Sequence, residues 1–315
     1  MNTHMDKQWD AVIIGGGAAG LTAGIILARA RFATLIVDGG SPRNAPAEHM
    51  HGFLSRDGMA PTAFLETGRA ELVGYGGTVT RATVADAVRA GDGTFNLVLE
   101  PGATISARAV LVATGLSDEL PDIPGLRDHW ATDVHSCPHC HGYEVRGRSI
   151  AVLGSAMRAG SVHFAGLMRR YSEDVSFVRN GVTLVDAERA RLTGYGVRLV
   201  DGDAKRVVSK DGRVSGIELD GGELVGCDTI FVAPTPRPHD VVLTTLGCAQ
   251  DPETGFTAVD PGGATDIPGV WAAGNVVNPR AQVVTAAGAA SAAAIAITGW
   301  LLDKELTQAA EGDVR

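Results

Sequence analysis

The sequence predicts an α/β protein with a nucleotide-binding βαβ unit near its N-terminus. Residues 10–40 read as a short apolar strand, a glycine-rich turn, an apolar helix and a second strand. A further strand followed by a glycine turn comes at residues 149–160. Glycine accounts for 41 of the 315 residues, about twice its usual share, without the period of collagen. Strand-to-helix turns that approach a nucleotide need glycine, so this composition suits the predicted fold.

The first unit carries every part of a dinucleotide-binding motif. The turn GGGAAG follows the strand predicted at 11–14, and a helix is predicted at 21–30. Gly15 permits the turn, Gly17 lets the backbone approach a pyrophosphate, and Gly20 lets the helix pack closely on the strand. The helix N-terminus supplies amide donors for the phosphates.

An acidic residue completes this first unit. The second strand, predicted at 34–37, ends in Asp38, which follows Gly15 by 23 positions. An acid at this distance is placed to bond a ribose hydroxyl. A glycine pattern alone is weak evidence, but the full order of strand, glycines, helix, strand and acid predicts a bound dinucleotide.

Composition restricts the class of protein. Hydrophobic residues make up 45% and charged residues 20% of the chain, which fits a soluble globular protein. The net charge of −9 argues against nucleic acid as a partner. The N-terminal MNTHMDKQWD is polar, so we expect no signal peptide and a cytoplasmic protein. Residues 283–302 have the length of a membrane span, but their Ala, Gly, Ser and Thr content predicts a buried, close-packed helix and no membrane association.

Residues 136–147, SCPHCHGYEVRG, raise a question about chemistry. Cys137 and Cys140 form a C-x-x-C-H pattern that matches haem attachment, half of a zinc site, a structural disulfide or free-thiol pair, or a redox-active disulfide. Haem attachment of this type needs export. Zinc needs four ligands, and counting His135 and His141 with the cysteines crowds them into seven residues, without a second ligand pair further along. We therefore favour a redox-active disulfide without a metal, and expect Cys227 and Cys248 to be buried small residues.

Two later segments resemble those of a known flavoprotein class. VLVATG at 110–115 and GVWAAGN at 269–275, followed by RAQV at 280–283, read as strands that end in glycine turns. With the first glycine motif they resemble the pyridine-nucleotide–disulfide oxidoreductases that have two dinucleotide domains. The resemblance implies FAD and two three-layer, Rossmann-like domains, the second inserted in the first. It implies a discontinuous FAD domain of residues 1–117 and 241–315, an inserted NAD(P)H-like domain of residues 118–240, and a homodimer.

The position of the cysteines narrows this resemblance to the low-molecular-weight thioredoxin reductases. Their motif is typically Cys-Ala-Thr-Cys-Asp-Gly directly before the second nucleotide-binding strand, and CPHCHG stands there in this chain. The resemblance implies that Cys140 faces flavin C4a, that Cys137 faces the substrate, and that His141 replaces an acid–base aspartate. Histidine titrates near neutrality and can take and return a thiol proton. His139 is either a residue that lowers a thiol pKa or an exposed turn residue.

The flavin site that the motifs and the resemblance imply draws on several separate segments. One departure from the family is Asn275, where Gly-Asp is usual; a neutral amide there should make the anionic reduced flavin easier to form. The predicted cofactor-binding residues are Gly15, Gly17, Ala19, Gly20, Asp38, Gly39, Arg43, Asn44, His51, Thr114, Gly115, Gly274, Asn275, Gln282 and Val283.

The second nucleotide motif is damaged. In GSAMRAG at 154–160, Ala156 stands where a second glycine should let backbone touch pyrophosphate. The next strand, at 175–178, ends in Arg179-Asn180-Gly181, where the family carries a basic cluster for a 2′-phosphate. We expect the fold of this half to persist and tight NADPH binding to be lost.

This profile resembles the flavin-dependent dithiol oxidases of the gliotoxin and holomycin type. They carry Cys-x-x-Cys-His-Gly-Tyr/Phe-Glu, which residues 137–144 match, and a segment like 42–53 close to the flavin. The resemblance implies electron flow from a small-molecule dithiol or small redox protein, through the cysteines and FAD, to oxygen. Two alternatives remain: a disulfide reductase fed by NADPH or another donor, and a flavin-binding redox sensor without turnover.

Overall fold

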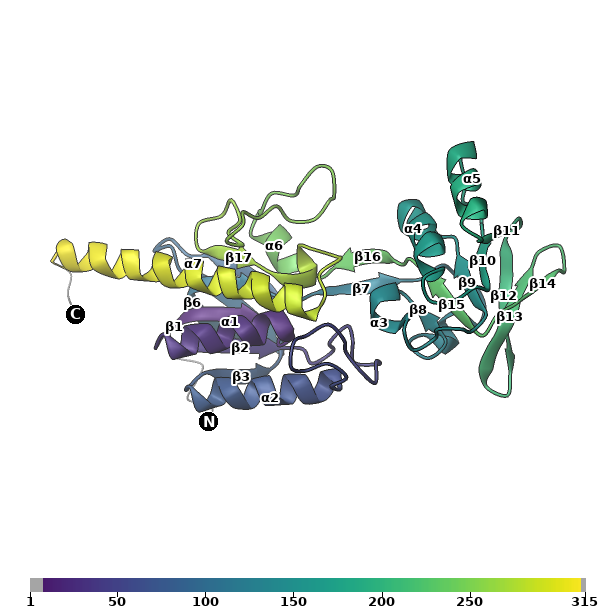
Figure 1. Ribbon diagram of the computed structural model, residues 1–315. Coiled ribbons are helices and arrows are strands. Elements are labelled where there is room, and N and C mark those ends of the chain that lie inside the picture. Colours follow the sequence, from purple (N-terminus) through teal and green to yellow (C-terminus); the bar gives the residue numbers. More distant parts are fainter. Residues whose placement is uncertain (1–7, 313–315) are drawn as a thin grey trace. The chain divides into compact units, whose positions relative to one another are not determined.

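The computed structural model describes residues 8–312, so most of the polar N-terminal segment lies outside the described residues. The chain forms two compact units (Figure 1). Unit 1 comprises the described residues up to Ser117 together with those from Pro238 onward, and unit 2 comprises Asp118–Arg237. The sequence placed the second boundary after residue 240. Strands β7 (Leu116–Glu119) and β16 (Thr235–Pro238) pair with each other where the chain passes between the units.

Unit 1 is built on a seven-stranded mixed sheet. Its parallel strands follow the order β3-β2-β1-β6, and β17 pairs with the C-terminal half of β6. Two antiparallel strands, β5 (Phe95–Glu100) and β4 (Thr83–Arg89), continue the sheet beyond β6. In the register of the central strands, Ile13 lies between Ile36 and Leu111. The bounds are β1 Gln8–Ile14, β2 Thr34–Asp38, β3 Thr78–Arg81, β6 Ala103–Val112 and β17 Val270–Ala272. Because all five of these strands are parallel, their carboxyl ends lie at the edge of the sheet that carries the glycine turn, where α/β sheets bind ligands.

Two layers cover this sheet. Helices α1 (Ala18–Arg29), α2 (Pro61–Gly74) and α7 (Val283–Ala310) pack on one face. The antiparallel strands β4 (Thr83–Arg89) and β5 (Phe95–Glu100) and the short helix α6 (Val241–Thr245) cover the other. The first helix begins at Ala18, earlier than the predicted residue 21, because Gly17 is already its N-cap.

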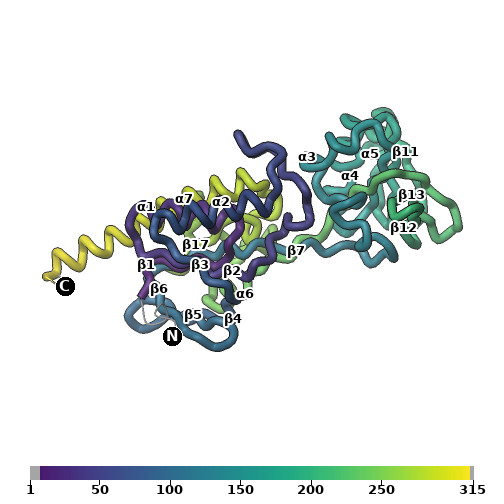
Figure 2. The backbone as a smooth tube through the Cα atoms, turned by 90° about the horizontal axis from the view of Figure 1, so that it is seen from below, coloured from purple at the N-terminus to yellow at the C-terminus, as the bar shows by residue number. Residues whose placement is uncertain are grey.

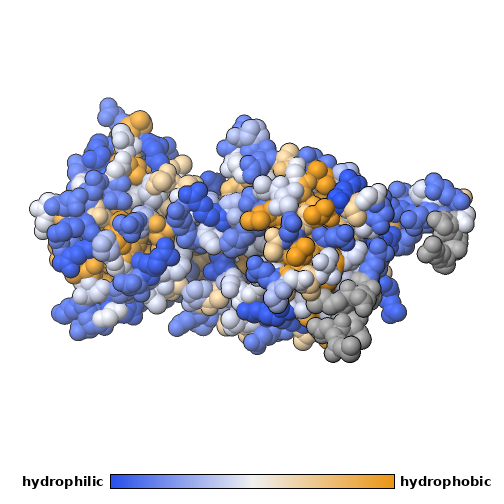
Figure 3. All heavy atoms as spheres, turned by 180° about the vertical axis from the view of Figure 1, so that it is seen from behind, coloured by the Kyte–Doolittle hydropathy of each residue, from blue (hydrophilic) through white to orange (hydrophobic). Residues whose placement is uncertain are grey.

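Helix α7 is buried along one face only, which corrects the prediction of a buried helix. Ala290, Ile297 and Leu301 lie in the core of unit 1, whereas Ile295 and Leu306 are 64% and 61% exposed. By length and composition alone the helix could cross a membrane. Its last turns extend beyond the sheet in Figures 1 and 2. Figure 3 shows hydrophobic spots scattered among hydrophilic residues on the face that it displays.

Unit 2 repeats the same plan. Its parallel sheet has the order β11-β10-β9-β15-β8, with helices on one face and a three-stranded antiparallel sheet on the other. The predicted three-layer α/β architecture is thus present in both units. The bounds are β8 Val134–His135, β9 Ile150–Leu153, α4 Arg158–Met168, β10 Val175–Val178, α5 Asp186–Gly194, β11 Arg198–Val200, β12 Ala204–Lys210, β13 Arg213–Leu219, β14 Leu224–Gly226 and β15 Thr229–Val232.

Candidate functional site

The glycine turn of unit 1 is shaped by steric demands. A Cβ on Gly15 would collide with the carbonyl of Ala113, and one on Gly20 would collide with the carbonyl of Gly15. Gly17 differs, because a Cβ there would meet no atom within 4 Å. Gly15 and Gly20 therefore allow strand and helix to pack, while Gly17 leaves open space at the N-terminus of α1. Among the described residues no side chain caps this helix, so its first amides suit an incoming phosphate.

Asp38 lies beside this turn at the end of β2. Its carboxylate accepts hydrogen bonds from the amides of Gly16 at 3.2 Å and Gly40 at 2.9 Å, and the side chain is largely buried. The Arg69 guanidinium donates to the same carboxylate at 3.1 Å. Asp38 therefore borders the turn, as a ribose-binding acid must. The sequence did not point to Arg69, which comes 31 residues later on α2.

Two loops that are distant in sequence meet at the same end of the sheet. Arg43 donates to the carbonyl of Pro279 at 3.4 Å, and a Cβ on Gly52 would lie 3.8 Å from Oε1 of Gln282. The loop is compact because Asp57 accepts from the Gly52 amide at 3.0 Å and contacts His51 at 3.3 Å. The Gly52 hydrogen bond, and then His51, lower the pKa of Asp57. The predicted residues of 43–52 and 279–283 thus belong to one surface.

The 3₁₀ turn η2 (Gly274–Val276) follows β17 and continues this surface. Gly274 has φ +83°, and a Cβ there would lie 3.0 Å from the Cβ of Ala19 on α1. Nδ2 of Asn275 donates to the carbonyls of Asn278 at 3.0 Å and Ala281 at 2.9 Å. A carboxylate could not make these two bonds. Since Nδ2 is engaged, Oδ1 is the atom of Asn275 that is left to accept the predicted hydrogen bond from a ribityl hydroxyl.

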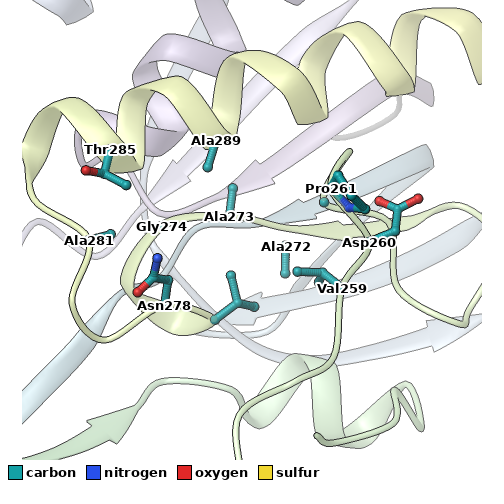
Figure 4. Close-up of a pocket in the computed structure, with 12 residues that line it drawn as sticks. Val259, Asp260, Pro261, Ala272, Ala273, Gly274, Asn278, Ala281, Thr285 and Ala289 are labelled. Atoms are coloured by element: carbon teal, nitrogen blue, oxygen red, sulfur yellow. The ribbon is translucent and has the colours of Figure 1, made fainter. Parts of the chain in front are cut away.

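A cavity of about 170 Å³ opens beside η2, below the first turns of α7 (Figure 4). It is too small for a dinucleotide and has Gly274 as its one predicted cofactor residue. It is lined by Val259, Asp260, Pro261, Gly263, Ala272, Ala273, Gly274, Val277, Asn278, Ala281, Thr285 and Ala289. Gly17, Asp38 and those residues of the two loops that were predicted to bind the flavin lie outside this cavity.

Thr114 and Gly115, at the end of β6, are joined to the returning chain. The Thr114 hydroxyl donates to the His239 carbonyl at 2.7 Å, and the His239 amide donates to the Gly115 carbonyl at 3.0 Å. The imidazole of His239 lies 3.1 Å from the carbonyl oxygen of Thr114 and 2.7 Å from Oγ of Ser117. Sequence reasoning missed His239, because no local pattern links it to a turn more than a hundred residues earlier.

The remaining predicted flavin residues lie on the same end of unit 1. Ala19 is buried in the first turn of α1, Gly39 directly follows β2, Asn44 lies in the loop with Arg43, and Val283 is the first residue of α7. The structure thus gathers the predicted cofactor residues in unit 1 and the predicted redox residues in unit 2.

Cys137 and Cys140 form a disulfide in unit 2. The short helix α3 (Pro138–His141) lies between β8 and β9 and holds both sulfurs, with Cys137 as its N-cap. Pro138 fits the first helical position because its missing N–H needs no partner there. The Cys140 amide points at Sγ of Cys137 at 3.1 Å. Since each sulfur is bonded to the other, the structure supports a disulfide at this motif and not a zinc site.

The three nearby histidines occupy different environments. His139 is exposed, and His141 is half-buried. The ring of His141 stacks on that of His135, with centroids 4.3 Å apart and an interplanar angle of 16°. Burial, followed by the neighbouring His141, lowers the pKa of His135 to about 3. The sequence analysis considered His135 only as a possible zinc ligand. It did not predict the stacking of His135 on His141, because nothing in the short strand before the motif indicates that contact.

The other two cysteines are buried, as predicted. Cys227 is 4% and Cys248 is 8% exposed. Burial raises the pKa of the Cys227 thiol to about 12 and also raises that of Cys248. Neither thiol is set up as a nucleophile.

Comparison with known proteins now identifies the family. Residues 9–291 match the model of the pyridine nucleotide-disulphide oxidoreductase family. The chain belongs to this family. It is therefore a flavin-dependent oxidoreductase of the thioredoxin reductase-like type, and the family recognised from the motifs is confirmed.

Several relatives cover most of the chain. Thioredoxin reductase aclD of Aspergillus oryzae is 32% identical over 285 residues, which span 85% of this chain and 88% of that protein. The crystal structure of HlmI matches with a TM-score of 0.93 and 48% identity, covering 98% of this chain and 96% of that one. An oxidoreductase from Agrobacterium tumefaciens matches with a TM-score of 0.86 and 32% identity, covering 94% and 99%.

In this thioredoxin reductase-like chain, two backbone amides of the second nucleotide turn, at 154–160, donate hydrogen bonds to serine side chains of the protein itself. The Ser155 amide donates to Oγ of Ser161 at 3.2 Å, and the Met157 amide donates to Oγ of Ser155 at 3.2 Å. Ser161 is fully buried, whereas Ala156 is exposed at the turn. Helix α4 begins at Arg158, after the turn, with Met157 as its N-cap.

The basic residues near this turn are paired with acids. Arg158 forms an ion pair with Glu188 and donates to the Thr183 carbonyl at 3.0 Å. Arg179 donates to Asp201 at 2.6 Å. An open cavity of about 420 Å³ remains, lined by Ser155, Ala156, Arg158, Asn180, Gly181, Val182 and Thr183. Both arginines that could read a 2′-phosphate thus have internal partners.

Proposed function

We propose that this protein is an FAD-dependent dithiol oxidase that uses oxygen and not NADPH. The observation that carries the proposal is the contrast between a disulfide at Cys137 and Cys140 and a second nucleotide turn that has Ala156 in place of a glycine and bonds its amides to Ser155 and Ser161. An enzyme that keeps its disulfide but does not hold NADPH can take its electrons from thiols. The motif Cys140-His141-Gly142-Tyr143-Glu144 supports the same reading through its resemblance to the gliotoxin- and holomycin-type oxidases.

The chemistry balances as follows. A substrate thiolate attacks one sulfur of the disulfide, and the second substrate thiol displaces the mixed disulfide, so the substrate leaves oxidised with both cysteines reduced. Bound FAD would supply the two-electron acceptor that lets the cysteine dithiol re-form its disulfide, and oxygen would take up the electron pair with two protons as hydrogen peroxide. In this scheme Cys137 meets the substrate and Cys140 meets the flavin.

His141 is the proton carrier of this scheme. It directly follows Cys140, and a neutral imidazole can accept a thiol proton at neutral pH. His139 is an exposed neighbour that acts, if at all, through its charge on the thiol pKa. FAD would be held by Gly17 and the α1 amides at its pyrophosphate, and by Asp38 at a ribose hydroxyl.

The substrate class and setting follow from the same reading. We propose a small-molecule dithiol or the dithiol of a small redox protein as the electron donor. We also propose that the enzyme is a cytoplasmic homodimer without a nucleic-acid or membrane partner. The net charge of −9 supports the exclusion of nucleic acid.

Disulfide reduction with NADPH is the second candidate, favoured by the names of relatives such as thioredoxin reductase aclD. Anaerobic mixing of the flavoprotein with NADPH or with dithiothreitol separates the two. We expect dithiothreitol to bleach the flavin absorbance within seconds and NADPH to leave it unchanged. Readmitted oxygen should restore the absorbance with one equivalent of hydrogen peroxide. Rapid bleaching by NADPH would support the reductase, and no bleaching by either would support a sensor without turnover.

A further inference from the structure

The stacked pair of histidines is more than a packing detail. His135 ends strand β8, and its side chain is 5% exposed. One face of its ring carries His141, and the ring of Phe231 on the neighbouring strand β15 lies 5.4 Å away at an angle of 44°. Strands β8 and β15 are paired with Phe231 opposite His135. The sheet thus fixes His135 in place, and His135 in turn supports His141 of the short helix α3.

Packing alone does not explain a histidine at this position. Nδ1 of His135 is buried, and among the described residues it has no hydrogen-bond partner. An unsatisfied buried nitrogen costs free energy that a phenylalanine or leucine in the same core would not. Burial, and then the nearby His141, also lower the pKa of His135 to about 3, which favours the neutral ring at neutral pH.

Two charged groups near His135 act on its pKa besides His141. Asp133, directly before β8, favours protonation of His135, and Arg148, before β9, opposes it. Asp133 is itself engaged by the Arg213 guanidinium on β13, at 2.8 Å from Nε. Phe231 on β15 carries no charge. Among the described residues, the one titratable ring packed against His135 is therefore that of His141.

We propose that His135 is a positioning residue for the thiol–disulfide reaction: its buried, neutral ring is the platform that orients His141 next to Cys140. The proposal rests on the proposed role of His141 as the proton carrier. A flat aromatic support holds the imidazole in one orientation, and its neutrality leaves His141 as the only member of the pair that gains the thiol proton. A displaced His141 would lose the alignment on which proton transfer depends.

The test uses the FAD-loaded protein and three variants at this position. His135→Ala removes the platform, His135→Leu fills the core without an aromatic face, and His135→Phe keeps a flat ring without nitrogens. His163→Ala is the matched control, because His163 is an exposed histidine on α4 of the same unit. Two readouts are compared: anaerobic flavin reduction by dithiothreitol in a single turnover, and the NMR titration of His141 with labelled histidine.

We expect His135→Ala and His135→Leu to slow reduction about 10- to 100-fold and to raise the titration midpoint of His141 by about half a pH unit, since its ring gains water. His135→Phe should stay within about threefold of the wild type, because it keeps the stack. Unchanged rates and titration in the folded Leu variant would show a purely structural histidine. A Phe variant as slow as the Ala variant would show that a ring nitrogen of His135 acts itself. Neither readout uses oxygen or NADPH, so a wrong electron acceptor would leave this test intact.

Discussion

The two units share the same βαβ plan, but the turns after their first strands differ in where the helix begins and in what the turn amides bond to. In unit 1 the turn leads directly into α1, with Gly17 as the N-cap and open space where its Cβ would be. In unit 2 the helix starts later, after Met157, and the turn amides bond to Ser155 and Ser161. A nucleotide site needs free amides at the helix start, which only the first turn offers.

The ends of the second strands differ in the same sense. Asp38 in unit 1 bonds to the amide of Gly16 and offers a carboxylate beside the turn. The corresponding residue in unit 2 is Arg179, which donates to Asp201 at 2.6 Å. The next residue, Asn180, uses both ends of its amide internally: Nδ2 donates to the Gly154 carbonyl at 2.9 Å and Oδ1 accepts from the Ala204 amide at 3.0 Å. In unit 2, side chains of the protein thus bond to groups at the end of the second strand, whereas in unit 1 a carboxylate borders the turn.

The largest expected effect comes from matched substitutions in the two turns. Gly17→Val should abolish flavin retention, because its side chain fills the space that a pyrophosphate needs. Ala156→Val should leave flavin content and dithiol oxidation within about twofold of the wild type, as exposed substitutions usually do. The measurement is the ratio of flavin to protein absorbance after gel filtration, with circular dichroism as the check on folding. Equal flavin loss in both variants would end the distinction between the turns.

How far the sequence predicted these two turns is instructive. The glycine turn, Asp38 and strand β10 at 175–178 were readable because they depend on residues close together in the chain. The contacts of Arg69 with Asp38 and of His239 with Thr114 were not, because they join residues 31 and 125 positions apart. The burial of α7 was overestimated: composition shows that a helix is apolar but not how much of its length the core covers.

The second prediction concerns the disulfide of unit 2. Replacing either Cys137 or Cys140 by serine should reduce dithiol oxidation to background, because no disulfide can re-form. The two variants should differ in absorbance. Cys137→Ser leaves the Cys140 thiolate, which should give a long-wavelength charge-transfer band with oxidised flavin, and Cys140→Ser should give none. The reverse pattern would show that Cys137 is the flavin-facing cysteine.

A smaller loss is expected at the histidine that follows the disulfide. His141→Ala should slow dithiol oxidation about 10²- to 10⁴-fold, the usual worth of a general base, while keeping FAD and the disulfide. His141→Asp should recover part of the rate by restoring a carboxylate that can carry a proton. His139→Ala should cost much less, since that side chain is exposed. Oxygen uptake with a dithiol across pH 5.5–9 provides the measurement. An unchanged pH profile in His141→Ala would place the base elsewhere.

The smallest expected effect concerns how the contribution of a buried carboxylate to the free energy of unfolding depends on pH in each unit. The Asp133 side chain of unit 2 is 1% exposed and is held by Arg213 and by the Val214 amide at 3.1 Å. Burial alone would raise the pKa of Asp133, but these bonds outweigh it and lower the pKa. A carboxyl whose pKa is lower in the folded state stabilises the fold above its unfolded value of 3.8, and loses that contribution as the pH falls through the folded value.

Asp133→Asn should therefore lower the free energy of unfolding by about 1–3 kcal/mol at pH 7 and by much less near pH 3. The matched variant in unit 1 is Asp10→Asn, whose carboxylate meets Arg108 at 2.8 Å with 26% of its side chain exposed. Its loss at pH 7 should be about 0.5–1 kcal/mol, because water screens that pair. Urea titrations followed by circular dichroism at both pH values give the comparison. A loss for Asp133→Asn that is the same at pH 7 and pH 3 would mean that packing around Asp133, and not its charge, stabilises β8 beneath the disulfide.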